Sequence, residues 1–484
     1  MKKTLLISVF ITLITCTLSC EVQDDNHVPE SIQAQNFVWK GLNLYYLWQT
    51  DVPDLADNRF SNQEGLNQFL KTYNDPKVLF QDLLNKPVSQ YPNSGESIDR
   101  FSVIFSDYTQ LEGILSGTTL NNGAEIGLYY KNNSQTDIFG VVRYILPGSD
   151  AALKNVQRGD LFYAIDGTAL TVNNYRTLLS SNSYTLYLAH YDSGNITPNG
   201  QSVTLTKSVI SENPVHITSV IQSGAHRIGY LMYNGFYPQY ESALNQAFAE
   251  LKSAGITELV LDLRYNSGGS IATATRLASM ITGQFSGQVF AKEQWNAKIE
   301  SYYNSHGLSD RFYNRFTTDL GNGENIQSIQ LNKIWILTSK ATASASELVI
   351  NGLKPYIQVI QIGDATVGKN VGSITLYDSP NFSKNGANTK HKYAMQPLVL
   401  KVVNKDGFGN YINGLAPNFE YKENLGQMGV LGQADEPLLQ KAIQNISGAG
   451  RSSLRPGRDF KMFQDQRIEA QLKSEMYKTA AILP

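Results

Sequence analysis

The second half of the chain alternates between short apolar runs and stretches in which apolar residues recur at helical spacing. Residues 259–263 are almost all apolar, as in a strand of a parallel sheet that is covered on both faces. Apolar residues recur every three or four positions from 244 to 251, and Gly255 follows, as a helix end favours. The expected elements are strand 228–232, helix 244–251, strand 259–263, helix 271–281, strand 334–337, helix 345–353 and strand 359–362. From about residue 226 onward, this pattern predicts an α/β domain.

Residues 30–110 contain helical patches that are rich in aromatic side chains. Pro53 ends the first patch, because proline cannot continue a helix. The first patch carries Phe37, Trp39, Tyr45, Tyr46 and Trp48. We therefore expect residues 30–110 to form a helical domain that packs on the rest of the chain.

Residues 111–208 have the pattern strand, turn, short helix, turn and strand. Asp166-Gly167 is a tight-turn signal after an apolar run. The segment resembles a PDZ domain, a module that adds an extended peptide to its sheet as an extra strand. The resemblance implies peptide contacts at the loop with Ile126, Gly127 and Leu128.

Glu125, next to this loop, stands where PDZ domains often have glycine. Such domains hold the terminal carboxylate of a peptide on backbone N–H groups. A glutamate pointing inward would repel that carboxylate. A PDZ domain with a regulatory or structural role is therefore an alternative to a domain that captures peptide termini.

The first residues of the chain predict export. Lys2 and Lys3 precede an apolar stretch at 5–18, which is short for a membrane span and typical of a signal peptide. Cys20 follows a small residue, so that cleavage after residue 19 would leave a cysteine at the mature N-terminus, as in bacterial lipoproteins. We predict a signal peptide at 1–19 and lipidation of Cys20.

The polar composition after Cys20 predicts a flexible, lipidated tether at residues 20–29. Its Gln23-Asp24-Asp25 resembles a surface-export signal of some Gram-negative lipoproteins. These features predict a protein anchored by lipid in the bacterial cell envelope, in the outer membrane, and leave open whether it faces the surface. An ordinary signal peptide with incidental cysteines is the alternative.

Composition and motifs exclude several classes of protein. The net charge of −2 leaves no basic excess to neutralise phosphates, so the chain is not expected to bind nucleic acid. The sequence contains no His-Glu-x-x-His zinc spacing and no Gly-x-Ser-x-Gly nucleophile elbow. We therefore expect neither a metal nor a cofactor, and no Ser-His-Asp triad.

Ser344 and Lys369, 25 residues apart in the sequence, form a candidate catalytic pair. A serine hydroxyl is a weak nucleophile and needs a base to take its proton. A lysine can be that base where burial lowers its pKa, and Ser-Lys pairs are known. Ser344 and Glu347 also match a capping box ahead of an apolar run. Taken alone, the motif more often starts a helix than carries out catalysis.

A polar loop after the strand at 259–263 supplies the second part of the candidate site. The loop ends in Gly268 and Gly269, and such a loop can turn backbone N–H groups towards a developing oxyanion. Asp262 and Arg264 lie at its beginning. We expect these two side chains to hold the loop by hydrogen bonds rather than to react.

The serine, lysine and paired-glycine motifs, in this order and spacing, resemble the C-terminal-processing (tail-specific) serine proteases. The resemblance covers about residues 100–440. It implies a multidomain α/β protein, in which a crotonase-like catalytic domain at 209–440 follows the PDZ and helical domains. Residues 441–484 remain as a C-terminal tail, with a short helix expected at 468–476.

The same resemblance implies roles for particular residues. Ser344 would attack a peptide carbonyl, Lys369 would be its base, and an acyl-enzyme would form. The oxyanion hole would comprise the N–H of Ala345 and that of Gly268 or Gly269. Ser373 stands where some relatives carry a glutamine that orients the lysine.

Two other functions remain open at this point. A non-catalytic surface lipoprotein that binds peptides or glycans on a protease-like scaffold is the main alternative, although the intact serine and lysine favour an enzyme. An acyl-CoA enzyme of the same fold has little support, because an exported protein meets little CoA. Protein or peptide substrates are expected, but the sequence indicates neither their identity nor the oligomeric state.

Overall fold

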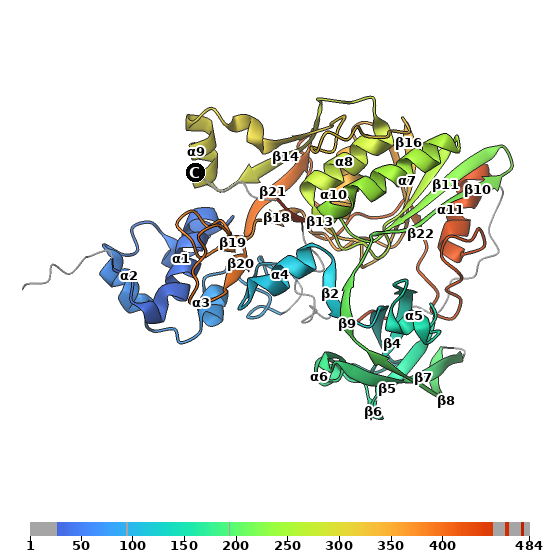
Figure 1. Ribbon diagram of the computed structural model, residues 1–484, viewed down its shortest axis with the longest axis horizontal. Helices are drawn as coiled ribbons and strands as arrows, with labels where there is room; N and C mark the ends of the chain where they lie inside the picture. The colour runs from blue at the N-terminus through green and yellow to red at the C-terminus, as the bar shows by residue number, and fades with distance from the viewer. Residues whose placement is uncertain (1–26, 93–94, 193, 449–459, 464–475, 479–484) are drawn as a thin grey trace, which may run out of the picture.

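The computed structural model describes residues 27–92, 95–192, 194–448, 460–463 and 476–478. Figure 1 shows helices at the N-terminal end of the molecule, a small β-rich domain below, and a large α/β part to the right. Cys20 and the predicted signal peptide lie outside the described residues. Within the described ranges, no helix has the length and apolar character needed to cross a membrane.

Helices dominate the N-terminal region, as the sequence predicts. They are α1 (Gln33–Tyr45), α2 (Gln63–Leu70), α3 (Pro76–Asp82) and, further on, α4 (Tyr108–Leu115), with 3-10 turns at Glu30–Ile32, Gln49–Asp51 and Pro53–Leu55. Asn62 and Asp75 start α2 and α3, because their side chains accept backbone N–H bonds that the first helical turn leaves unpaired. A three-stranded sheet joins this region to the rest: β1 (Val103–Phe105), β20 (Ala394–Gln396) and β19 (Leu376–Tyr377).

The small β domain comprises the elements from β2 to β9. Its main sheet has the order β3 (Ala124–Tyr130), β4 (Ile138–Ile145), β5 (Leu161–Ile165), β7 (Ser183–Asp192) and β8 (Asn195–Thr206), with β6 (Thr168–Ala169) beside β5 and helices α5 (Asp150–Leu153) and α6 (Tyr175–Ser180). The chain enters and leaves this domain through an antiparallel ribbon, β2 (Thr118–Asn121) paired with β9 (Ser208–Ser211). The domain occupies the residues at which the sequence predicts a PDZ domain.

A largely parallel sheet forms the centre of the large α/β part. Its order is β10 (Val215–Ser223), β11 (His226–Tyr233), β12 (Glu258–Asp262), β16 (Lys333–Thr338), β17 (Gln358–Gly363) and β22 (Phe419–Glu420). The helices are α7 (Glu241–Ser253), α8 (Ile271–Thr282), α10 (Ala345–Leu353) and α11 (Pro437–Ser447). The predicted α/β order of strands and helices from residue 226 is confirmed, and α10 has the predicted bounds.

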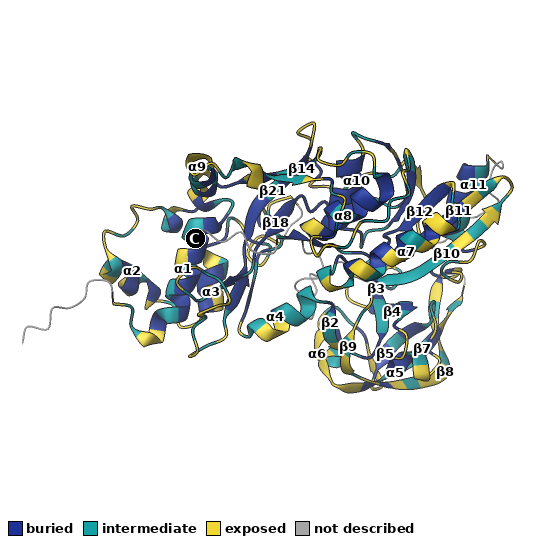
Figure 2. Cartoon of the chain, turned by 45° about the horizontal axis from the view of Figure 1, so that its top comes forward, coloured by how far each residue is buried: buried dark blue, intermediate teal, exposed yellow. Residues whose placement is uncertain are grey.

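Side chains alternate between two hydrophobic clusters on the two faces of this sheet. On β11, Leu231 and Tyr233 join the cluster that contains α7, α8 and α10, whereas Tyr230 and Met232 join the cluster that contains α11. This is the two-residue period of a strand with both faces covered. Every residue of α10 is buried (Figure 2), so the helix that Ser344 precedes is fixed on all sides. The predicted end of the catalytic domain at residue 440 falls inside α11, which belongs to this core.

A second sheet lies against α8 and α10. Its order is β13 (Gly269–Ser270), β23 (Met476–Tyr477), β18 (Val371–Ser373), β21 (Leu398–Asn404), β14 (Val289–Trp295) and β15 (Tyr313–Arg315), and α9 (Ala297–Ser305) and a 3-10 turn at Ser309–Phe312 lie beside it. The remaining 3-10 turn, Pro238–Tyr240, leads into α7. The helix expected at 468–476 is wrong at its last residue, because Met476 pairs as a strand with Gly269. Residues 468–475 lie outside the described ranges.

Candidate active site

Ser344 occupies a strained position immediately before α10. Its φ is +67°, in the left-handed region that residues other than glycine rarely adopt and that is common at functional sites. The side chain is fully buried, and its hydroxyl has no hydrogen-bond partner among the described residues. Ser344 and Glu347 have the arrangement of a capping box at the start of α10, yet the Ser344 hydroxyl makes no full hydrogen bond to a described residue. A buried hydroxyl without such a partner is a candidate for chemistry.

Glu347 connects the serine to the lysine. Its Oε2 accepts the backbone N–H of Ser344 at 2.7 Å and that of Lys369 at 2.8 Å. Its Oε1 accepts the N–H of Gly368 at 2.7 Å and the hydroxyl of Thr366. Burial raises the pKa of this carboxyl, whereas the four hydrogen bonds oppose the rise. One buried side chain thus ties the serine and lysine loops together.

Lys369 is fully buried in the loop between β17 and β18. Its Nζ lies 4.8 Å from the centre of the Phe101 ring. The Arg100 guanidinium donates to the carbonyl of Gly368 at 2.6 Å and to that of Ile412 at 3.2 Å. Residues far away in the sequence therefore cover the lysine. Nothing local in the sequence connects Phe101 to Lys369, so only the fold reveals that Phe101 covers the lysine.

The paired glycines adopt backbone conformations that other residues would strain. Gly268 has φ +115° and Gly269 has φ +139°, and a Cβ on Gly269 would lie 2.5 Å from the carbonyl oxygen of Phe236. The N–H of Gly268 donates to Asn266 Oδ1 at 2.9 Å. The N–H of Gly268 therefore already has a partner, and the oxyanion role of Ala345 with Gly268 or Gly269 stays a prediction.

The loop that carries these glycines is tied directly to the serine loop. The carbonyl of Asn266 accepts the N–H of Ala343 at 3.1 Å and the hydroxyl of Ser346 at 3.0 Å. Ala345 begins α10, so its N–H has no partner within the helix. The positive end of the helix dipole lies at the same place. These contacts place the start of α10 beside the glycine loop, as stabilisation of an oxyanion requires.

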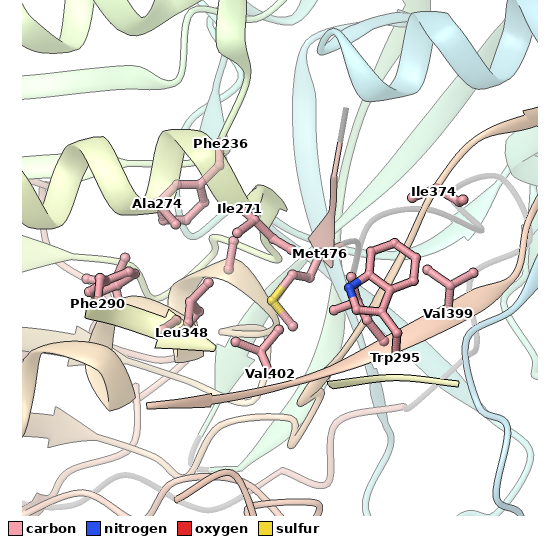
Figure 3. Packing of buried hydrophobic residues seen from close by; sticks show 14 of the residues in the cluster. Phe236, Ile271, Ala274, Phe290, Trp295, Leu348, Ile374, Val399, Val402 and Met476 are labelled. Carbon is pink, nitrogen blue, oxygen red and sulfur yellow. The ribbon is translucent and has the colours of Figure 1, made fainter. Parts of the chain in front are cut away.

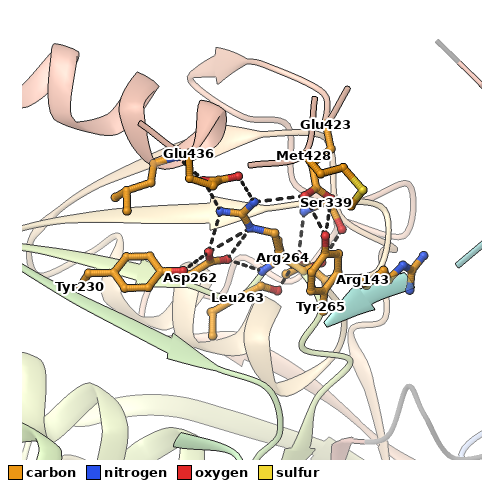
Figure 4. A network of polar contacts seen from close by, with 12 residues as sticks. Arg143, Tyr230, Asp262, Leu263, Arg264, Tyr265, Ser339, Glu423, Met428 and Glu436 are labelled. Atoms are coloured by element: carbon orange, nitrogen blue, oxygen red, sulfur yellow. Dashed lines mark hydrogen bonds and ion pairs between the residues drawn. The ribbon is translucent and has the colours of Figure 1, made fainter. Parts of the chain in front are cut away.

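Asp262 and Arg264 hold the loop and do not face Ser344 in any described contact. Figure 4 shows the Arg264 guanidinium between Asp262 and the carboxylates of Glu436 and Glu423. Arg264 and Asp262 are both fully buried, and Glu436 accepts from Arg264 at 2.6 and 2.9 Å. The geometry agrees with the predicted structural role of this pair.

The same network reaches the small β domain through Arg158. Its guanidinium donates to Glu423 at 2.6 Å and to the Tyr265 hydroxyl at 2.6 Å. Burial alone would raise the pKa of Glu423, but Arg158 and Arg264 lower it to about 2. Glu423 is therefore ionised and joins the small β domain to the loop beside the candidate oxyanion hole.

A cavity of about 180 Å³ lies where the small β domain meets the glycine loop. It is lined by Gly123, Ala124 and Glu125 of the small β domain, by Ser267, Gly268 and Gly269 of the glycine loop, and by further residues that include Glu212, Tyr237 and Tyr477. The predicted peptide-contact residues Ile126, Gly127 and Leu128 follow directly on β3, the edge strand of the small β domain. The start of β3, at Ala124 and Glu125, and the glycine loop therefore line the same cavity.

No cluster of three or more His, Cys, Asp or Glu side chains suited to hold a metal ion occurs in the part of the chain that the structure describes. His391 pairs with Asp378 at 2.9 Å, and His226 lies 4.0 Å from Glu258. Neither histidine has a described contact with Ser344.

Comparison with known proteins gives two family matches. The model of peptidase family S41 matches residues 227–387, and that of the peptidase S41 N-terminal domain matches residues 33–103. The first match contains Ser344, Lys369 and the glycine loop, and the second ends at Val103, just after Phe101.

Curated relatives and a solved structure agree with these matches. The chain is 25% identical over 278 residues to the chloroplastic C-terminal processing peptidase of Tetradesmus obliquus, covering 55% of each chain. It is 27% identical over 351 residues to the chloroplastic carboxyl-terminal-processing peptidase 2 of Arabidopsis thaliana, covering 68% of this chain and 61% of the relative. The chain thus spans somewhat more than half the length of these relatives.

A crystal structure of a protein of Bacteroides fragilis assigned to the S41 proteases shares the fold. Its TM-score is 0.64 at 24% identity, and the superposition covers 88% of this chain and 99% of that chain. The family matches lie on the regions that carry the serine, the lysine and the residues covering them. The chain therefore contains a region that matches peptidase family S41, at residues 227–387, and one that matches the peptidase S41 N-terminal domain, at residues 33–103.

Proposed function

We propose that this chain is a serine endopeptidase of the C-terminal-processing type, with Ser344 as nucleophile and Lys369 as base. The observation that carries the proposal is the Glu347 carboxylate, which holds the backbone of both residues on one oxygen atom. The buried hydroxyl of Ser344, without a partner among the described residues, supports it. A degenerate binding protein would have no need to keep a strained serine beside a buried lysine.

In the proposed reaction the neutral amine of Lys369 takes the proton of the Ser344 hydroxyl. Burial favours this neutral form, because desolvation disfavours an ammonium ion, whereas the face of Phe101 attracts the cation and works against it. Ser344 Oγ then attacks the peptide carbonyl.

The resulting oxyanion is stabilised by the N–H groups of Ala345 and Gly269, assisted by the dipole of α10. The ammonium group of Lys369 returns its proton to the leaving amine, and the peptide C–N bond breaks. Water then attacks the acyl-enzyme, with Lys369 again as base, and releases the second product.

We further propose that the small β domain is a PDZ domain and that the core is crotonase-like. The position of Ile126, Gly127 and Leu128 on β3, the edge strand of the main sheet, supports the first assignment, because PDZ domains bind peptides along such a strand. The proposed domains are the helical domain at 30–110, the PDZ domain at 111–208 and the catalytic domain from 209 to the end of α11 at Ser447. Export as a lipoprotein through Cys20 remains a proposal from the sequence.

The test is to incubate the protein with an unbiased peptide library beside its Ser344→Ala variant. We expect wild-type protein to cleave peptides and Ser344→Ala to have no turnover while its thermal unfolding is unchanged. Ser279→Ala is the matched control, because it removes a buried hydroxyl in α8 that donates to the carbonyl of Thr275 and has no described contact with Ser344 or Lys369. Turnover in Ser344→Ala equal to that of wild type would overturn the assignment.

A further inference from the structure

A short segment close to the end of the described chain lies in the active site as an extra strand. Strand β23 (Met476–Tyr477) pairs in parallel with β13 on one side and with β18 on the other. Strand β13 continues from the glycine loop, and β18 begins two residues after Lys369. The segment therefore fills the space between the strand that leaves the candidate oxyanion hole and the strand that leaves the candidate base.

Backbone contacts fix the register of this segment. Gly269 is opposite Met476, and Ser373 is opposite Tyr477. The N–H of Lys478 donates to the carbonyl of Ser373 at 3.0 Å, and a Cβ on Gly372 would lie 3.2 Å from the carbonyl oxygen of Met476. Strand edges on both sides are paired by this segment, so a second peptide cannot bind there at the same time.

Three consecutive side chains of the segment have three different surroundings. Met476 is fully buried, and Figure 3 shows it among Ile271, Leu348 and Val402. Tyr477 lines the cavity beside Gly268 and Gly269, and its hydroxyl donates to the carbonyl of Leu115 at 3.1 Å.

Lys478 reaches a buried acid. Its Nζ lies 2.9 Å from Oε2 of Glu293, whose side chain is fully buried, and it also donates to the carbonyl of Arg311 at 3.0 Å. The site of Met476 therefore accommodates a large apolar side chain, and the site of Lys478, two residues later, accommodates a cation.

A second part of the same region lies along the edge of the small β domain. The carbonyl of Lys461 accepts the N–H of Tyr130 at 3.0 Å, and the N–H of Phe463 donates to the carbonyl of Leu128 at 2.8 Å. Met462 bridges Tyr129 in antiparallel register. Residues 460–463 thus extend the sheet beyond its edge strand β3, in the manner of a bound peptide.

The ring of Phe463 lies between the edge strand and helix α6. Its centre is 5.4 Å from that of Tyr130 on β3 and 5.2 Å from that of Tyr175 on α6. Aromatic pairs at these separations add to the apolar contact. The edge strand and the active site are therefore both occupied by segments of the chain's own last described residues.

We propose that residues 460–463 and Met476–Lys478 occupy the two positions at which a peptide substrate binds, so that the chain is its own competitive inhibitor. The proposal rests on the proposed peptidase function and names the substrate class: peptides in which a large apolar residue is followed two positions later by Lys or Arg. A tethered segment competes at an effective concentration of about 1 mM. Added peptide therefore binds weakly until the segment is displaced.

The test is a binding measurement that needs no catalysis. A fluorescent peptide with the sequence of residues 474–480 is titrated into the full chain carrying Ser344→Ala, with or without the further pair Met476→Asp and Lys478→Glu. We expect the pair to tighten the apparent Kd at least about tenfold. The matched control carries Val430→Asp and Lys252→Glu, the same charge changes at two exposed positions, and should bind like the parent.

The probe and a milder variant make the result specific. Probe peptides with Asp for the methionine or Glu for the lysine should lose the gain in affinity. Lys478→Ala removes the ion pair with Glu293 and leaves Met476 in place, so it should tighten binding by a smaller factor. This variant provides a test of the proposal if the double variant does not fold. Equal affinity of the probe for parent, Lys478→Ala and double variant would overturn the proposal. A different result separates the two proposals. If the double variant binds the probe more tightly but the same variant with Ser344 restored cleaves no peptide, the peptidase function is wrong and the proposed segment sites are retained.

Discussion

Replacement of Gly269 by alanine tests the candidate oxyanion hole most directly. The new Cβ would lie 2.5 Å from the carbonyl oxygen of Phe236, whereas ordinary contacts begin at 3.4 Å. The glycine loop must therefore move by about 1 Å, a displacement that can cost about 10²-fold in rate when it affects positioned groups. It cannot move freely, because the N–H groups of Phe236 and Ser270 bond across this contact at 3.0 and 2.9 Å.

We expect Gly269→Ala to lower kcat by about 10²- to 10³-fold, the usual loss when one oxyanion donor is removed. This corresponds to about 3–4 kcal/mol of transition-state stabilisation. The φ of +139° adds strain, so the free energy of unfolding should fall by about 1–3 kcal/mol. Steady-state kinetics on a cleaved library peptide and urea unfolding measure the two effects separately.

Gly287→Ala is the matched control for backbone strain. Gly287 also has a positive φ, +80°, but a Cβ there would have no neighbour within 4 Å. Its variant should lose about 1 kcal/mol of stability and retain full kcat. If Gly269→Ala keeps kcat within threefold of wild type while it remains folded, Gly269 does not take part in oxyanion stabilisation.

Three other predictions concern the base, the buried acid and the membrane anchor. Lys369→Arg should abolish turnover, because a guanidinium does not deprotonate near neutral pH. Wild-type kcat/KM should rise with pH as the lysine becomes neutral. A pH–rate profile of both proteins measures these effects, and an active Lys369→Arg variant would show that another group is the base. Because the pKa of Glu423 is lowered to about 2, the ionised carboxylate contributes up to about 3 kcal/mol to the free energy of unfolding. This contribution is complete above about pH 4.5 and is lost as the pH falls towards 2. In urea unfolding, Glu423→Gln should flatten this part of the dependence of stability on pH, and an unchanged dependence would contradict the ion-pair assignment. Cys20→Ser should move the protein from the membrane to the soluble fraction of the producing cells, and a variant that stays with membranes would show that Cys20 is not the anchor.

The elements that the sequence predicts well are those with a local cause. Strand β12 and helix α10 follow from apolar periodicity, and both are completely buried. The serine, lysine and glycine motifs also lie in short contiguous segments. These parts of the fold and of the candidate site are therefore visible without any knowledge of tertiary contacts.

The features that the sequence does not reveal depend on contacts between distant segments. Glu347 reads as half of a capping box, and only the fold brings Gly368 and Lys369 to its carboxylate. The Asn266 side chain, which accepts the N–H of Gly268, is likewise a contact that motif spacing alone does not reveal. The local pattern predicts a helix at Met476, because the strands that pair with this segment lie more than 100 residues away in the sequence.

The paired strands β2 and β9 determine which parts of the chain can be exchanged in chimeric proteins. Thr118 lies opposite Ser211 and Asn121 opposite Ser208, so both ends of the small β domain meet at one narrow stem. A domain with adjacent ends is well suited to insertion into a host chain, and it can be exchanged for another module without rerouting the host backbone. The helical region offers no such junction, because Arg100 and Phe101 reach the loop around Lys369. Chimeras that exchange residues 118–211 should therefore keep Ser344, Lys369 and the residues that cover the lysine but lose the contact of Arg158 with Glu423, whereas those that replace residues 30–110 should lose the cover of the lysine itself.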